Sequence, residues 1–218
     1  FYQPVFRSET GKLYGAEALM RFISEKFGMV SPAEFIPILE ETGLIIPAGR
    51  WMMGEAMGKC SQIREALPEF QVSINISQVH AAKSDVILDV IAAMEKAKLP
   101  ADALIIELTE SDLLEQNINE RHFLTELQRM KIKLALDDFG TGYSNLHCIS
   151  DMNPGYVKMD KDFTAKAMSS ERDYELFKKI IEMVHSIGVR ICVEGIEKED
   201  WHLKMKELQA DYLQGYFF

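Results

Sequence analysis

Short apolar runs rich in β-branched residues alternate along this chain with longer segments in which apolar residues recur at helical spacing. The runs predict strands at residues 1–7, 14–22, 72–77, 104–110, 133–138, 156–160, 190–195 and 211–218. The segments between them predict helices at about 32–43, 45–66, 85–98, 119–130, 173–187 and 198–208. Alternating strands and helices are typical of a mostly parallel sheet wrapped by helices, and this number of units favours a closed (β/α)8, TIM-barrel-like α/β fold over an open sheet.

The first two strands depart from that alternation. Only "SETGK" separates them, and a loop of this length suits a hairpin but not a helical crossover. We therefore expect one strand of the N-terminal hairpin to run antiparallel to the rest of the barrel.

Length and charge limit the classes of function. We expect residues 1–218 to form a single domain, and because both ends fall inside structured segments we expect it to be excised from a longer multidomain protein. A formal charge of -10 argues against extended nucleic acid as a partner. The three cysteines show no paired spacing, which indicates a reducing, cytoplasmic compartment. The sequence has no long apolar run and no signal peptide, so we expect no membrane contact within this segment. Other segments could still anchor the full-length protein to a membrane.

Polar side chains share one face of several predicted strands. In "VSINIS", Asn75 alternates with isoleucines, and in "RICVEG" Glu194 alternates with Ile191 and Val193. Most of these polar residues lie late in their strands, at the end where barrel enzymes carry their chemistry. The converging set is Glu17, Asn75, Glu107, Asp137, Asp138, Lys158, Glu194 and Gln214.

This set contains five carboxylates and one lysine. Two like charges about 4 Å apart repel by about 4 kcal/mol at an effective dielectric constant of about 20. Either some carboxylates are protonated or a divalent cation binds, and oxygen ligands suit Mg²⁺ or Mn²⁺. The adjacent pair Asp137 and Asp138 could bridge two such ions.

Each residue of the set also has a purely structural interpretation. A single acidic residue at a strand end is usually a solvated loop carboxylate or a helix cap, and Lys158 could be a structural ion-pair partner. Gly140 and Gly142 match no phosphate-binding loop, and the five histidines show no zinc-site spacing. The recurrence of one inward polar group at nearly every strand end favours a functional site.

The motifs of the chain, in order, resemble the EAL domain family of cyclic di-GMP phosphodiesterases over essentially the whole length. They are "YQP", "GAEALMRF", "FIPILEETG", "NIS", "ELTE", "DDFGTGYS", "KMD", "EGIE" and "QGY". The resemblance implies metal-dependent hydrolysis of cyclic di-GMP to linear pGpG by a homodimer, with regulatory domains elsewhere in the full-length chain. The alternatives are a catalytically silent cyclic di-GMP receptor and a protein-interaction scaffold.

The resemblance also assigns residues. It places the first metal ion on Glu17, Asn75, Glu107 and Asp137, and the second on Asp137, Asp138 and Glu194. Lys158 and Gln214 would position or activate water, and Glu110 would tether the loop that contains "GTGYS". Gln3, Leu19, Arg21 and Asp160 match substrate-binding positions.

The chain departs from the family pattern at several positions, none of which is a metal ligand. Phe22 stands where the family usually has Trp, Gly155 where it usually has Asp, and His80 where Gln commonly follows "NIS".

Overall fold

A computed structural model describes residues 1–109, 118–140, 149–150 and 152–218. Its main sheet consists of β1 (Tyr2–Arg7), β2 (Leu13–Ala18), β5 (Gln71–Asn75), β6 (Leu104–Thr109), β7 (Lys133–Phe139), β8 (Tyr156–Met159), β9 (Arg190–Val193) and β10 (Tyr212–Gln214). These strands close into a barrel in the order β1-β10-β9-β8-β7-β6-β5-β2. The predicted barrel class is confirmed, and each predicted strand segment overlaps one strand of the barrel.

The expected antiparallel strand is β1. β7, β8, β9 and β10 pair in parallel, whereas β1 pairs antiparallel with β10 and places Val5 opposite Gln214. Between β1 and β2 the chain makes a tight turn in which the backbone N–H of Arg7 donates to the carbonyl of Lys12 at 2.8 Å. Gly11 allows this turn because its φ of 65° lies in the left-handed region.

The helices follow the predicted segments, with two additional α-helices and one short 3-10 helix. They are α1 (Pro32–Thr42), α2 (Ile45–Arg64), α3 (Gln78–Lys83), α4 (Val86–Ala97), the 3-10 helix η1 (Ala101–Ala103), α6 (Ile118–Arg129), α8 (Lys161–Ser169), α9 (Glu171–Ser186) and α10 (Glu199–Glu207). The sequence analysis did not predict α3 and α8, which are too short to give a clear periodic pattern. Ser77 caps the start of α3, and Asp160 caps the start of α8.

The predicted strand 14–22 is too long. β2 ends at Ala18, and the chain then forms a separate antiparallel hairpin of β3 (Phe22–Ser24) and β4 (Gly28–Val30). Gly28 lies in this hairpin with a φ of 70°, which favours glycine. Because an apolar run has no marker of where one strand ends and another begins, the sequence could not separate β2 from β3.

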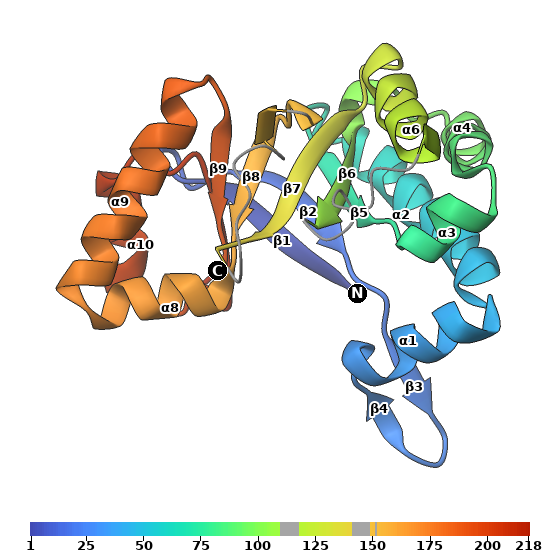
Figure 1. The fold of residues 1–218 in the computed structure, drawn as a ribbon, viewed down its shortest axis with the longest axis horizontal. Helices are drawn as coiled ribbons and strands as arrows, with labels where there is room; N and C mark the ends of the chain where they lie inside the picture. The colour runs from blue at the N-terminus through green and yellow to red at the C-terminus, as the bar shows by residue number, and fades with distance from the viewer. Residues whose placement is uncertain (110–117, 141–148, 151) are drawn as a thin grey trace. The chain divides into compact units, whose positions relative to one another are not determined.

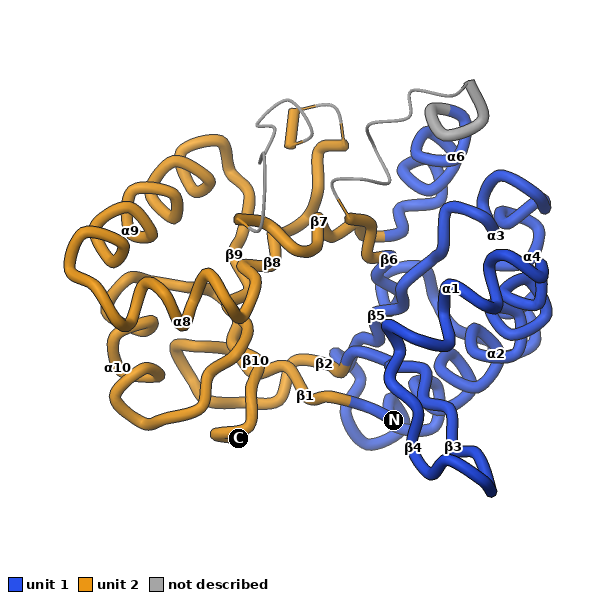
Figure 2. Tube along the Cα trace, turned by 60° about the horizontal axis from the view of Figure 1, so that its bottom comes forward, with its two compact units in different colours: residues 1–2, 17–106, 115–132 blue, residues 3–16, 107–114, 133–218 orange. Residues whose placement is uncertain are grey.

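By its packing, the chain divides into two compact units (Figure 2). The first contains residues 1–2, 17–106 and 115–132, and its core lies where α2 packs against β5 and α4. Met53, Met57 and Cys60 of α2 are buried, as are Ile74 of β5 and Val90 of α4. These contacts fix β5, whose last residue is Asn75.

The second unit contains residues 3–16, 107–114 and 133–218. Within it, α9 packs against α8 and β9 (Figure 1). Phe177 of α9 is fully buried, and its ring lies 5.2 Å from that of Phe163 in α8. Burial of Val157 and Ile191 completes an apolar support behind β8 and β9, and this support holds the polar side chains of those strands in place.

None of the helices in the described part of the chain has the length and apolar composition needed to span a bilayer.

Candidate active site

Lys158 on β8 is the centre of a buried group of charged side chains in the second unit. Its Nζ atom lies 2.7 Å from Glu107 Oε2, 2.8 Å from Glu194 Oε1 and 3.1 Å from Asp137 Oδ1. The Lys158 side chain is only 2% exposed, and that of Glu107 only 1%. One ammonium group with three donors therefore meets three carboxylates from three other parts of the sheet.

Three carboxylates against one lysine leave this group with excess negative charge. Charge-assisted hydrogen bonds at these distances are strong, yet one ammonium can offset only one of the carboxylates. A further positive charge at the group would stabilise it, because ionised carboxylates are costly to bury unpaired.

A β-bulge explains why two aspartates stand side by side. Leu136 lies opposite Val157 and Phe139 lies opposite Met159, so two residues of β7 occupy the space opposite Lys158 alone. These two residues are Asp137 and Asp138. Strict alternation would turn them to opposite faces, whereas a bulge re-aims one side chain.

The backbone of Asp138 carries the distortion of the bulge. Its φ of 55° lies in the left-handed region, which aspartate tolerates better than most residues. Its N–H donates to Asp137 Oδ1 at 2.9 Å, and this hydrogen bond fixes the orientation of the neighbouring carboxylate. Asp137 is buried and Asp138 is exposed. The two adjacent aspartates therefore lie at the boundary between the buried charged group and solvent.

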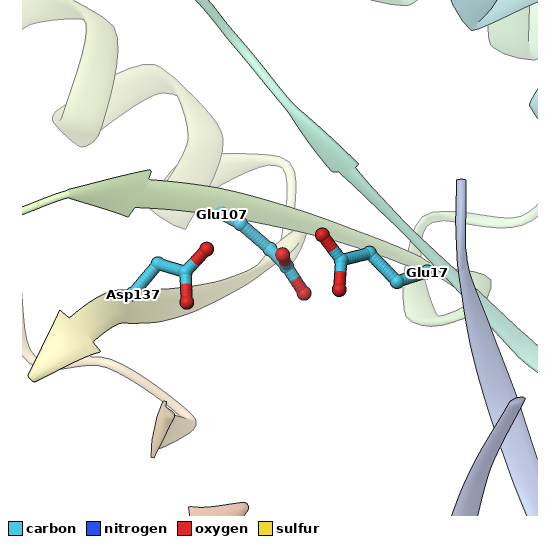
Figure 3. A group of neighbouring side chains, drawn as sticks. All are labelled: Glu17, Glu107 and Asp137. Carbon is cyan, nitrogen blue, oxygen red and sulfur yellow. The ribbon is translucent and has the colours of Figure 1, made fainter. Parts of the chain in front are cut away.

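In the first unit, Glu17 of β2 and Asn75 of β5 form the second polar element of the site. The Asn75 side-chain amide donates to Glu17 Oε1 at 2.9 Å. Glu17 also belongs to a group of buried carboxylates in which one oxygen each from Glu17, Glu107 and Asp137 lies within 4.8 Å of the others (Figure 3). Three oxygens so placed match the hard ligands that Mg²⁺ and Mn²⁺ prefer, so these residues fit a divalent cation.

Gln214 and Glu194 are held by a close backbone contact. The N–H of Ile196 donates to the carbonyl of Gln214 at 3.0 Å, and the N–H of Phe217 donates back to the carbonyl of Ile196 at the same distance. Gly215 lies between these bonds, and a Cβ atom there would overlap the Ile196 backbone. The sequence motifs "EGIE" and "QGY" therefore meet through a glycine that has no room for a side chain.

The remaining predicted residues lie in different surroundings. Leu19 and Arg21 line a cavity of about 270 Å³ in the first unit, together with Phe1, Ile23 and Trp51. Arg21 donates to the carbonyl of Met20 at 2.8 Å. This cavity contains both apolar surface and a guanidinium, as a nucleotide subsite would.

Asp160, Gln3 and Glu110 were also predicted as site residues. Asp160 is buried and accepts from the N–H groups of Asp162 and Phe163, so it serves as the N-cap of α8. Gln3 lies half-buried in β1. Glu110 lies outside the described residues, as do Gly142 and the rest of "TGYS".

Sequence reasoning found the charged residues of this site but missed the bulge and the N-cap role of Asp160. The bulge has one sequence signal, the pair of aspartates that is separated from Gly140 only by Phe139, but this signal does not distinguish a bulge from a turn. Asp160 can be recognised as an N-cap only when α8 is known to begin at Lys161.

The chain belongs to the EAL domain family, whose profile matches residues 1–218. Among curated proteins, it is 32% identical over 215 residues to the cyclic di-GMP phosphodiesterase PA2567 of Pseudomonas aeruginosa, covering 99% of this chain and 37% of that protein. For four other relatives, including the signaling protein YkoW of Bacillus subtilis, this chain spans only 26–32% of the relative's length.

Solved structures of EAL proteins are also similar to this chain. The EAL enzyme Bd1971, in a form bound to cAMP and cyclic di-GMP, superposes with a TM-score of 0.93 at 30% identity, over 99% of this chain and 60% of that one. A PaMucR phosphodiesterase in complex with cyclic di-GMP gives a TM-score of 0.88 at 29% identity, over 99% of this chain and 87% of that one.

Proposed function

We propose that this domain hydrolyses one phosphodiester bond of cyclic di-GMP, a bacterial second messenger, to give linear pGpG. The observation that carries the proposal is the buried group of carboxylates around Lys158, at the positions where EAL motifs occur. The similarity to PA2567, a cyclic di-GMP phosphodiesterase, and to the PaMucR phosphodiesterase in complex with cyclic di-GMP supports the same substrate. Because the chain spans only part of its relatives, the proposal concerns this domain.

The donor set fits two divalent cations, Mg²⁺ or Mn²⁺. We assign Glu17, Asn75, Glu107 and Asp137 to the first ion, and Asp137, Asp138 and Glu194 to the second. When bound, such ions supply positive charge that polarises the phosphodiester and makes a nearby water more acidic.

Lys158 and Gln214 act beside the cations. The Lys158 ammonium orients three carboxylates at once, so that their oxygens are positioned before substrate arrives. Its positive charge also favours an anionic nucleophile and the negative charge that develops on phosphate. Gln214 can orient the attacking water by a hydrogen bond from a side chain that is 98% buried.

Leu19 and Arg21 are proposed to contact the ligand from their cavity, with Arg21 directed at a phosphate. Gln3 and Asp160 are proposed as further contacts, and Glu110 as the residue that tethers the loop at 141–144. The homodimer, the regulatory domains in the longer chain and the cytoplasmic location complete the proposal.

Incubation of the domain with cyclic di-GMP, followed by chromatography of the nucleotides, tests the function. The proposal predicts pGpG in the presence of Mg²⁺ or Mn²⁺ and no product in excess EDTA. Intact cyclic di-GMP after prolonged incubation with both ions would refute hydrolysis. Calorimetry on the same sample would then separate a silent receptor, which binds the ligand, from a scaffold, which does not.

Glu17→Ala tests the ligand assignment. It should abolish pGpG formation while leaving the circular dichroism spectrum unchanged, because the change removes a carboxylate and one hydrogen bond from Asn75. The exposed residue Glu65, which follows the last residue of α2, offers a matched control, Glu65→Ala, which should retain full activity.

A further inference from the structure

A second cavity, of about 560 Å³, lies within the second unit at the opposite end of the strands from Glu194 and Gln214. Arg190 begins β9 and Tyr212 begins β10, and both line it, whereas Glu194 and Gln214 lie at or beyond the other ends of these strands. Arg7 contributes from β1, which runs antiparallel. The cavity is therefore distinct from the candidate active site.

Three cationic side chains line this cavity: Arg7, Arg190 and Lys206. Two of them are held by aromatic groups. Arg190 Nη1 donates to the Tyr212 hydroxyl at 2.8 Å, and the Arg7 guanidinium lies 5.0 Å from the centroid of the Tyr14 ring. Guanidinium groups held in this way lose less side-chain entropy when they bind an anion.

Two acidic residues, Glu9 and Asp211, also line the cavity. Asp211 is already engaged, because its Oδ2 accepts from the N–H of Ile191 at 2.8 Å and lies 2.9 Å from His185 Nε2. Glu9 is exposed to solvent, where its charge is screened. The charged groups of the cavity carry a net positive charge, in contrast to the formal charge of -10 of the chain.

The Ser8 side chain gives an independent indication of a ligand. Ser8 lines the cavity and is only 2% exposed, and within the described ranges its Oγ has no hydrogen-bond partner. A buried hydroxyl without a partner is rare and destabilising, and calls for an explanation such as a bound ligand. Ser8 lines the same cavity as the three cations, and its hydroxyl could donate to an anion bound there.

We propose that this cavity is a binding site for a compact ligand that bears a phosphate group. Arginine forks and a lysine match the several acceptor oxygens of phosphate, and the Ser8 hydroxyl adds a neutral donor. A volume of about 560 Å³ accommodates a small organic phosphate as well as the free ion. The alternative is a network of charges that only stabilises the base of the barrel.

Calorimetric titration of the purified domain with inorganic phosphate tests the site, with EDTA present so that no cation can hold phosphate at the active site. We expect saturable binding that Lys206→Gln weakens about tenfold, as for a lost charge-assisted hydrogen bond. Lys59→Gln, which removes an exposed lysine of α2 that does not line the cavity, should bind like the unmodified domain.

Ser8→Ala separates ligand binding from a structural role. It should also weaken phosphate binding, while the melting temperature in phosphate-free buffer stays the same or rises, because the change removes an unsatisfied buried hydroxyl. Absence of saturable phosphate binding to the unmodified domain would overturn the proposal. So would phosphate affinities of Lys206→Gln and Ser8→Ala that equal the affinity of the unmodified domain. Neither variant alters the candidate active site, so pGpG formation reports separately on the proposed hydrolysis.

Discussion

The Lys158 side chain is only 2% exposed, and its ammonium group lies within 3.1 Å of three carboxylates. Replacing it by methionine keeps the volume of the side chain but leaves Glu107, Asp137 and Glu194 without their shared cation. We expect Lys158→Met to lower the free energy of unfolding by about 3–5 kcal/mol in EDTA, as when one partner of a buried ion pair is removed.

The same variant should respond to metal. Thermal unfolding with added Mn²⁺ should restore part of the lost stability, because a cation can offset the unpaired carboxylates. Lys59→Met, at an exposed site in α2, serves as the control and should melt like the unmodified domain. A Lys158→Met domain that melts normally in EDTA would show that the carboxylates do not need this charge.

Asp89 gives a prediction about pH. Burial acts to raise the pKa of Asp89, but hydrogen bonds from His80 and Arg50 outweigh it and lower the pKa below its usual value. A carboxylate whose pKa is lower in the folded state stabilises the protein above its unfolded pKa, and this stability is lost as the pH falls through the folded pKa.

Urea unfolding of Asp89→Asn measures this contribution. We expect a loss of about 1–3 kcal/mol at pH 7 that shrinks as the pH falls through the lowered pKa of Asp89, because the carboxylate of the unmodified domain then becomes protonated. Asp102→Asn is the control, because the Asp102 side chain is 72% exposed and lies 4.0 Å from Arg64. A pH-independent difference between Asp89→Asn and the unmodified domain would contradict the assignment.

At the scale of single elements, the bulge in β7 makes a separable contribution to stability and activity. Asp138 has a φ of 55°, which glycine adopts without strain. Asp138→Gly should therefore keep or slightly increase stability while abolishing pGpG formation, because it removes a proposed metal ligand. Asp138→Ala should lose activity as well and cost about 1 kcal/mol more than the glycine variant. Equal activity of Asp138→Gly and the unmodified domain would exclude Asp138 from the metal site.

The contact between the ends of β9 and β10 depends on Gly215. Because a Cβ at this position would overlap the Ile196 backbone, Gly215→Ala must displace one of the two segments, and with it Gln214 or Glu194. We expect a loss of about 3 kcal/mol or more in urea unfolding, in the range of a strained or overpacked buried site.

A matched change in α2 gives the control for Gly215→Ala. Gly54 lies within this helix, and nothing lies within 4 Å of a Cβ built on it, so Gly54→Ala should raise stability by about 0.5–1 kcal/mol. If Gly215→Ala and Gly54→Ala changed stability in the same direction, the close contact at Ile196 would not constrain the fold.

For the whole molecule, the barrel and its charged residues could be predicted because each corresponds to a pattern within a short stretch of sequence. Strands appear as short β-branched runs, and parity along a strand selects Glu107, Asp137 and Lys158 for one face. The structure places these three within hydrogen-bonding distance through Lys158. Alternation alone was therefore sufficient to find the buried part of the site.

Other features could not be predicted, because they depend on contacts between distant parts of the chain. The bulge adds one residue opposite Lys158, and only the pairing of β7 with β8 reveals it. The second cavity combines Arg7, Arg190 and Lys206, which share no motif or spacing in the sequence. The β3–β4 hairpin was missed because no glycine, proline, asparagine or aspartate stands between the end of β2 and the start of β3 to mark a turn.

The central claim is that the carboxylates gathered around Lys158 bind divalent cations, and titration with Mn²⁺ followed by electron paramagnetic resonance of the free ion tests it most directly. Asp137 is the assigned ligand of both ions, so the account predicts two bound ions in the unmodified domain and loss of both sites, or a strong weakening, in Asp137→Asn. The exposed Asp102→Asn control should bind like the unmodified domain. No binding to the unmodified domain, or unchanged binding to Asp137→Asn, would contradict the account.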